Sequence, residues 1–264
     1  MLHRSAALRA ITLIVPAMLL LKTAAVAADE DAAAIVPRTL PHSVQPLVAE
    51  PALEPQRDQP NATMPATPSA ARVLERLARI RSSMTSTRYD HQTRVRERKG
   101  IYIWDCSVMV AWVLERASQV ARRSLQLDRP LARDLYRAIQ RAPVGRARSG
   151  WERIAHIEDV RPGDMFAWRR PNDWPPRNTG HSGFALNAPQ RMPGFPRAYL
   201  VRIADATSIP HQDDTRAPYS GGGSGEGTIL FMTDGHGNIT HYGWHGAHSQ
   251  YIVETNVLFG RLHR

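Results

Sequence analysis

The sequence predicts an α+β fold in which N-terminal helices precede an antiparallel sheet of about five or six strands. Two observations support this prediction. Apolar residues recur at helical spacing between residues 70 and 140, and from residue 164 onward short apolar runs alternate with turns rich in Gly, Pro and Asn. A continuously apolar helix that begins at Cys106 is expected to be central and to pack on the sheet.

The first residues have the composition of an export signal. Two arginines precede an apolar run over 10–21, and Ala-rich residues follow at 24–28. This layout predicts a secretory signal peptide over 1–27, a periplasmic or secreted mature protein, and no stable membrane insertion after cleavage. An uncleaved membrane anchor is the alternative, which Pro16 and Lys22 disfavour because they interrupt the apolar character.

The segment 28–68 is a predicted linker. It is rich in Ala and Pro, and its prolines recur every few residues. Prolines at that density remove backbone donors and favour extended conformations, so we expect no contribution to a core. The folded domain is expected over 69–264, a length sufficient for one domain with a sizeable core.

Four segments of this domain carry helix signals. Helical spacing of apolar residues predicts one helix over 70–84 and a second from Cys106 to about Ala121. A third helix is expected to begin near Pro130, which is favoured in a first helical turn. The capping-box pattern at 149–152 predicts a short fourth helix.

The second half of the domain carries strand signals. Short apolar runs predict strands over 164–168, 182–186, 198–203, 228–232 and 239–244. The Asp-Gly-His-Gly-Asn stretch over 234–238 predicts a hairpin between the last two. The Gly-rich segment 221–227 lacks the Lys-Ser/Thr ending of a phosphate-binding loop and is predicted to be a mobile loop.

The chain is strongly basic. Its formal net charge is +10 at pH 7, and nearly all of the cations are arginines. A basic exported protein is attracted to anionic surfaces such as cell-wall polymers. Because no recognised nucleic-acid-binding module and no aromatic platform accompany the arginines, we expect no nucleic-acid partner.

The sole cysteine, Cys106, is the most informative residue for chemistry. A lone cysteine excludes an intramolecular disulfide and a multi-cysteine metal site, which leaves packing, intermolecular pairing or reactivity. Asp105 is a suitable N-cap, so Cys106 is expected in the first turn of its helix. There the helix dipole and the free amides stabilise a thiolate. Acyl transfer also requires a base, and His181 follows a Gly at a predicted strand start.

Three short motifs together resemble a known family. They are Asp-Cys-Ser at 105–107, Pro-Gly-Asp at 162–164 and Gly-His-Ser-Gly-Phe-Ala-Leu at 180–186. Their order and spacing are similar to those of the NlpC-type cell-wall cysteine peptidases, a branch of the papain-like superfamily. The resemblance covers roughly residues 85 to 210, and it implies a papain-like fold with the Cys-bearing helix packed on the sheet.

The resemblance also implies roles for individual residues. Cys106 corresponds to the nucleophile and His181 to the general base. A third polar residue on the following strand corresponds to Asp205, with His211 as the reserve candidate. An Asp is chemically adequate to orient the imidazole. The candidate substrate-binding residues, which line the pocket or supply an oxyanion donor, are Tyr102, Tyr89, Asp105 and Ser107.

The sequence therefore predicts an exported cysteine hydrolase that cleaves amide bonds of peptidoglycan stem peptides. The family usually has Gly where this chain has Val108, which narrows the approach to the thiol. The alternative is consequently a catalytically weak or inactive module that binds cell-wall peptides or a partner hydrolase.

No cofactor and no metal is predicted. His236, His241, His245 and His248 suggest a metal site, but they straddle a predicted strand and the loop after it, so no single helical face presents them. Solvated hairpin residues are the simpler interpretation. The sequence gives no indication of the oligomeric state.

Overall fold

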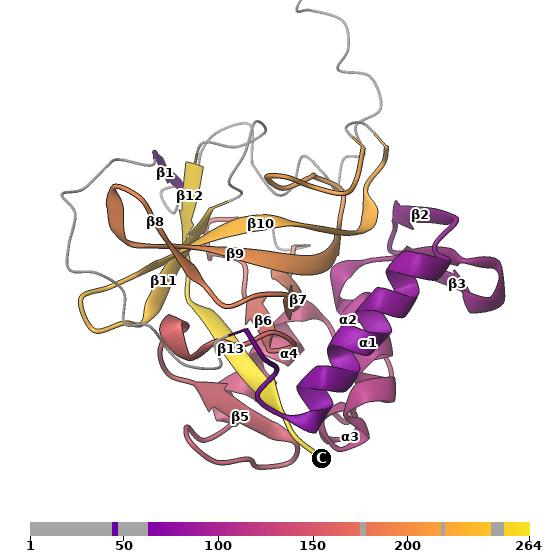
Figure 1. Cartoon of the computed structure of the whole chain (residues 1–264), viewed down its shortest axis with the longest axis horizontal. Helices are drawn as coiled ribbons and strands as arrows, with labels where there is room; N and C mark the ends of the chain where they lie inside the picture. The colour runs from indigo at the N-terminus through magenta and orange to yellow at the C-terminus, as the bar shows by residue number, and fades with distance from the viewer. Residues whose placement is uncertain (1–43, 47–62, 175–177, 218–219, 244–250) are drawn as a thin grey trace, which may run out of the picture.

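The computed structural model describes residues 44–46, 63–174, 178–217, 220–243 and 251–264 (Figure 1). The predicted signal peptide, 1–27, lies outside the described residues, and so does most of the predicted linker. In the described part of the chain, no helix has both the length and the apolar character needed to cross a membrane.

Helix α1 (Pro68–Ser83) opens the folded region, as predicted from its apolar spacing. Thr67, one position before the helix, accepts a hydrogen bond from the Ala70 amide and serves as the N-cap. Its buried face carries Val73, Leu77 and Ile80, which contribute to the core on the helical side of the molecule.

A small sheet delivers the chain to Cys106. It contains β2 (Ser86–Tyr89), β3 (Arg94–Arg96) and β4 (Ile101–Trp104) in the order β2-β4-β3, with the 3-10 helix η1 (Glu97–Lys99) before β4. Tyr102 and Trp104 of β4 are almost fully buried. This buried strand therefore fixes the start of the helix that follows it.

Helix α2 (Cys106–Ala117) begins at the cysteine, with Asp105 as its N-cap. The predicted helix to about Ala121 is divided, because Ser118 leaves the helical conformation and a separate helix α3 (Gln119–Ser124) follows. The Ser118 hydroxyl donates to the carbonyl of His263 near the C-terminus, which fixes the break. Helix α4 (Ala132–Arg141) confirms the predicted third helix.

The remaining described strands form one large sheet. They are β1 (Val44–Pro46), β5 (Trp151–Ile154), β6 (Met165–Trp168), β7 (His181–Ala185), β8 (Gln190–Met192), β9 (Phe195–Thr207), β10 (Gly223–Thr233), β11 (Ile239–Gly243), β12 (Tyr251–Glu254) and β13 (Val257–Leu262). The order is β1-β12-β11-β10-β9-β7-β6-β13-β5, and β8 pairs with β9 off this path. All of its pairings are antiparallel within the described residues.

The predicted papain-like α+β fold is wrong, because the structure is mostly β and its helices are few. Figure 1 shows α1, α2 and α3 on one side of a large sheet that dominates the molecule. The sheet exceeds the predicted five or six strands because the C-terminal strand β13 pairs with β6 and β5, and because β12 and β1 extend it beyond β11. These strands are short, so their sequences gave weak strand signals, and the segment that forms β5 was mistaken for a helix.

Both faces of the sheet are buried at strand β6. Met165 and Ala167 of β6 belong to the core cluster that includes α1, α2 and α4, whereas Phe166 and Trp168 belong to a second cluster. Since alternate residues of a strand point to opposite faces, the two clusters lie on opposite sides of the sheet. Helices α2 and α4 pack against β7 and β6 on the first side.

The segment 149–152 is a strand start, not the predicted helix. Ser149 has a φ of 53° and Gly150 a φ of 82°, both in the left-handed region. A helix N-cap requires an extended backbone, so Ser149 cannot cap a helix here. Reciprocal backbone hydrogen bonds between Arg148 and Trp151 close a tight turn into β5.

The Gly-rich segment is also not the predicted mobile loop, because β10 begins at Gly223 and pairs with β9. A Cβ on Gly225 would lie 2.6 Å from Nε of Arg216, and one on Gly227 would lie 2.6 Å from Cβ of His211. Glycines at these alternate positions therefore leave room for two side chains that lie across the strand.

The predicted linker also contributes to the sheet. Residues 44–46 form β1, whose Val44 is the register partner of Val253 in β12. The predicted hairpin at 234–238 is confirmed as the connection between β10 and β11, and Asp234 accepts the amides of His236 and Asn238 there.

We expect Gly225→Ala to lower the free energy of unfolding by about 1–3 kcal/mol, the usual cost of overpacking. The added methyl group would displace Arg216, which is pinned by ion pairs to two carboxylates. Urea denaturation measures the change. Gly235→Ala is the matched control, because nothing lies within 4 Å of its Cβ position, and it should change stability by less than about 0.5 kcal/mol. Equal effects of the two variants would contradict the packing argument.

Candidate active site

Cys106 occupies the first position of α2. The Asp105 carboxylate accepts the Val108 amide at 2.9 Å and the Ser107 hydroxyl at 2.8 Å, both at Oδ1. The amides of a first helical turn have no partners within the helix, so they can stabilise negative charge at the cysteine. Cys106 is buried, with 5% of its surface exposed.

His181 begins β7, opposite Trp168 of β6 in the sheet register. A Cβ on the preceding Gly180 would lie 1.9 Å from the Trp168 carbonyl oxygen, and the φ of Gly180 is 114°. Only glycine fits this close approach, which fixes where the His181 backbone lies. The imidazole packs against the rings of Phe166 and Trp168, each with a centroid separation of 6.0 Å.

The structure brings together the three residues that the sequence singled out for catalysis. Nε2 of His181 lies 2.7 Å from Oδ2 of Asp205, which is fully buried in β9. The Cys106 side chain hydrogen-bonds the His181 side chain. Because Nε2 of His181 is hydrogen-bonded to Asp205, Nδ1 is the ring nitrogen that remains to face the Cys106 thiol. Thiol, imidazole and carboxylate thus form one continuous chain.

Asp205 holds more than His181. Nε2 of His211, the reserve candidate, lies 2.8 Å from the same oxygen, Oδ2. The Arg216 guanidinium donates to Oδ1 at 2.8 Å, and it also binds Asp214 and the Gly223 carbonyl. Asp205 is therefore the residue that orients His181, while His211 supports Asp205.

The charge state of Asp205 follows from these partners. Complete burial opposes its ionisation, but the neighbouring His211 and Arg216, together with the hydrogen bond from His181, hold the pKa of Asp205 well below its usual range. Burial lowers the pKa of His211, and the Arg216 charge acts in the same direction. A neutral His211 that donates from Nε2 and an ionised Asp205 fit this geometry.

The pKa of His181 is raised, in contrast to that of His211. Burial opposes its positive charge, but the negative charge at Cys106 and the hydrogen bond to Asp205 outweigh burial and raise the pKa of His181 to about 10. An imidazolium beside a thiolate is the resting state of an activated cysteine nucleophile. Negative charge at Cys106 and the hydrogen bond to Asp205 therefore both favour a protonated His181.

Two residues without a recognisable motif support the start of α2. Nδ1 of His91 lies 3.2 Å from Oδ2 of Asp105, and a guanidinium nitrogen of Arg129 lies 3.3 Å from the same oxygen. Burial opposes the charge on Asp105, but the hydrogen bond from His91, followed by those from the Val108 amide and the Ser107 hydroxyl, lowers its pKa. The sequence pattern missed both residues because they approach Asp105 from separate segments of the chain.

The four predicted substrate-binding residues have different surroundings. Tyr102 is 1% exposed, and its hydroxyl lies 2.9 Å from the Ser83 hydroxyl in the core. Tyr89 is half-buried at the end of β2, and its ring meets the His91 ring at 5.6 Å. Asp105 and Ser107 are hydrogen-bonded to each other. Their roles toward substrate stay predictions.

His181, Asp205 and His211 could also be considered as metal ligands, since their ligand atoms lie within 4.8 Å of one another. Nε2 of each histidine, however, is already hydrogen-bonded to the Asp205 carboxylate, which in turn is paired with Arg216. A metal ion would have to displace these protons beside a guanidinium charge, so the cluster fits a proton relay better. Of the other suggested histidines, His245 and His248 lie outside the described residues.

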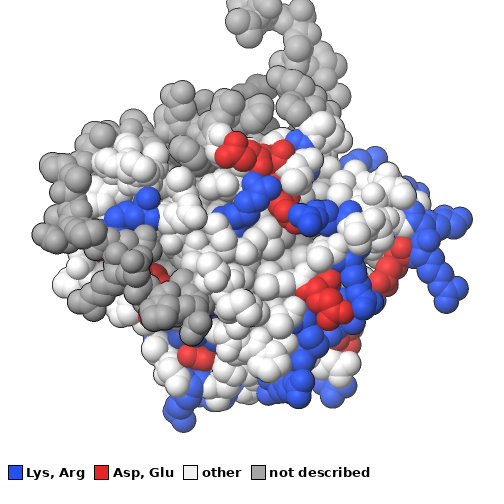
Figure 2. Space-filling view, viewed as in Figure 1, with Lys and Arg blue, Asp and Glu red and all other residues white. Residues whose placement is uncertain are grey.

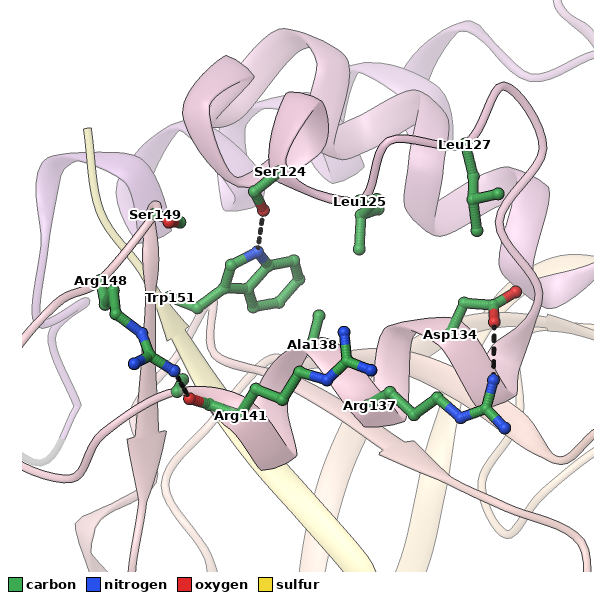
Figure 3. Close-up of a pocket in the computed structure, with 11 residues that line it drawn as sticks. Ser124, Leu125, Leu127, Asp134, Arg137, Ala138, Arg141, Arg148, Ser149 and Trp151 are labelled. Atoms are coloured by element: carbon green, nitrogen blue, oxygen red, sulfur yellow. Dashed lines mark hydrogen bonds and ion pairs between the residues drawn. The ribbon is translucent and has the colours of Figure 1, made fainter.

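A separate pocket of about 280 Å³ lies beside Trp151 (Figure 3). Trp151 pairs with Leu262 at one end of β13, whereas Val257 at the other end pairs with Trp168, the register partner of His181. The pocket is thus at the opposite end of the sheet from the Cys106 site. Two of its arginines are already engaged, Arg137 with Asp134 and Arg148 with a backbone carbonyl.

We expect Cys106→Ala to lower the pKa of His181 measured by NMR titration of its ring. The negative charge at Cys106 is the largest of the contributions that raise this pKa, and the variant removes it. Because the His181 pKa in the folded protein lies above its usual 6.5, the associated stability is fully present below pH 6.5. That stability is lost as the pH rises through about 10. An unchanged His181 pKa in the variant would exclude a thiolate–imidazolium pair.

No family model and no solved structure matches the chain. Over 190 residues the chain is 30% identical to a protein of Acanthamoeba polyphaga mimivirus named Uncharacterized protein R653. The match covers 63% of this chain and 81% of the viral protein. This extent and identity show that the chain belongs to the same protein family as mimivirus R653.

Proposed function

We propose that the protein is an exported cysteine hydrolase that cleaves amide bonds in peptidoglycan stem peptides. The observation that carries the proposal is the buried chain from Cys106 through His181 to Asp205. Its three members come from α2, β7 and β9, and they have the types and contacts that nucleophilic acyl transfer requires.

The reaction follows from these contacts. The Cys106 thiolate attacks the amide carbonyl carbon, and the backbone amide of Cys106 stabilises the oxyanion. The His181 imidazolium then donates its proton to the leaving amine, which breaks the C–N bond and leaves a thioester. Neutral His181 next accepts a proton from water, whose oxygen attacks the thioester. The C–S bond then breaks, which releases the carboxylic acid product and regenerates the Cys106 thiolate beside the His181 imidazolium.

The substrate class rests on the motifs and on the charge. The motifs around Cys106, Pro162 and His181 resemble those of the NlpC-type cell-wall peptidases at the level of these residues, although the overall fold differs from the one expected. Exposed cations cluster on β3 and η1, at Arg94, Arg96, Arg98 and Lys99. Figure 2 shows Lys and Arg side chains at the edge of the molecule where Figure 1 places β3. Such a surface favours association with anionic wall polymers.

Cys106→Ala is expected to lower the rate of amide hydrolysis in purified peptidoglycan by about 10³-fold or more, because the variant lacks the nucleophile. Chromatography of the released peptides measures the rate. Ser82→Ala is the matched control, since Ser82 is an exposed small residue on α1, and it should retain wild-type activity. Identical products from wild type and Cys106→Ala would refute the hydrolase proposal.

The dependence on pH provides a separate test. Protonation of the leaving amine requires the imidazolium, so kcat/KM should fall as the pH rises through about 10, the raised pKa of His181. Alkylation of Cys106 by iodoacetamide requires only the thiolate and should not fall over the same range. A parallel decline of the two rates would argue against His181 as the proton donor.

A second candidate function is a binding module without turnover. Cys106 is only 5% exposed. Val108, two residues further along α2, is half-buried and stands where the related motifs have Gly. Both features limit access of a peptide carbonyl to the thiol. This candidate is supported if wild type and Cys106→Ala bind stem peptides equally and neither cleaves them.

A further inference from the structure

Two adjoining cavities form a groove beside α4. They have volumes of about 710 and 400 Å³ and share Tyr136, Thr240 and Asn256 as lining residues. Arg169, which lines the larger cavity, directly follows Trp168, and its Cα is 2.9 Å from the position of a Cβ on Gly180. The groove therefore begins next to the backbone that carries His181.

Two arginines, one from each cavity, line this groove without an interaction partner for their guanidinium groups among the described residues. In the described part of the structure, the guanidinium groups of Arg153 and Arg169 take part in no hydrogen bond and no ion pair. Nε of Arg153 is nevertheless buried. A buried donor without an acceptor costs about 1–3 kcal/mol, and such an atom in a native structure calls for an unseen partner.

The charges of both arginines act on the pKa of Tyr136. The residue is 5% exposed and lines both cavities. Burial raises the pKa of Tyr136, and the charges of Arg169 and Arg153 act against that rise. Its hydroxyl is thus a neutral donor under the influence of both guanidinium groups, and it adds a third donor to the same part of the groove.

We propose that Tyr136, Arg153 and Arg169 bind a carboxylate of the peptide whose amide Cys106 attacks, an inference that rests on the proposed function. Guanidinium groups match carboxylates in geometry and charge. The groove carries acidic as well as basic side chains, so its positive charge is largely balanced. A singly charged anion therefore suits it better than a phosphate dianion. The acids that line the two cavities are Asp173, Glu254 and Asp234, and the cations are Arg153, Arg169 and Arg170.

A first experiment tests the site without any substrate. Sodium acetate is titrated into full-length wild-type protein while the Nε–H signals of the arginines are followed by NMR. The Arg153 signal should shift in a saturable way, and inorganic phosphate should shift it less at equal concentration. No acetate-dependent shift of the Arg153 signal would overturn the proposal.

A second experiment tests the link to substrate. Binding of a peptidoglycan stem tetrapeptide, and of the same peptide with its carboxylates amidated, is measured by calorimetry in Cys106→Ala protein, which cannot turn the peptide over. Adding Arg153→Gln or Arg169→Gln should weaken binding of the free peptide about 10- to 100-fold, and should leave the affinity for the amidated peptide unchanged. Equal affinities before and after either substitution would overturn the proposal.

Arg141→Gln is the matched control. Arg141, like Arg169, is an exposed arginine; it stands at the end of α4 and lines the pocket beside Trp151 in Figure 3. It should leave both affinities unchanged, and thermal unfolding should be the same for all three variants. Loss of binding in the control would overturn the assignment to the groove.

The two experiments also separate this proposal from the proposed function. If acetate binds at Arg153 but wild-type protein hydrolyses no wall peptide, the carboxylate site stands and the hydrolase proposal fails. If hydrolysis is observed and the arginine variants keep wild-type affinity for the peptide, the hydrolase proposal stands and the carboxylate site is overturned.

Discussion

The buried charge of Asp205 is the constraint on which the rest of the site depends. A carboxylate with no exposed surface is tolerated only when charged or hydrogen-bonding partners compensate for the lost water. Here His181 and His211 hydrogen-bond to Oδ2 of Asp205, and Arg216 donates a hydrogen bond to Oδ1. Removal of any one partner would leave part of a buried charge unsatisfied, so the position of each partner is tied to the others.

This constraint explains local features that would otherwise be unrelated. Arg216 and His211 come from the connection between β9 and β10, and they reach Asp205 only because Gly225 and Gly227 leave space across β10. Asp214 in the same connection accepts both the His211 amide and the Arg216 guanidinium, which holds the connection in place. A segment that its composition marks as flexible is thus held in the sheet by the partners of one carboxylate.

The sequence indicated which side chains meet at the site better than it indicated the fold. Cys106 was recognisable because it is alone and follows a capping Asp, and His181 because it follows a Gly at a strand start. These are local signals, and each depends on residues adjacent in the chain. Arg216 and Arg129 carried no such signal, since their partners lie in segments that are brought close only by folding.

The errors in the fold have a related physical cause. A strand buried on both faces lacks the alternation of apolar and polar residues that marks a half-buried strand. Trp151 and Ile154 of β5 contribute to the two opposite core clusters, so β5 shows no such alternation, and the capping-box pattern at 149–152 was interpreted as the start of a helix. The left-handed Ser149 that excludes the helix is a backbone property, which the sequence pattern of a capping box does not reveal.

The two histidines on Asp205 show how the site directs a proton. Both rings are buried and both are hydrogen-bonded to the same carboxylate oxygen, yet their pKa values move in opposite directions. Burial lowers the pKa of each, but His181 has the negative charge at Cys106 beside it, whereas His211 has the positive charge of Arg216. The arginine therefore both balances Asp205 and disfavours protonation of His211. The proton is thus favoured on the histidine that contacts the thiol, which is where the proposed acyl transfer requires it.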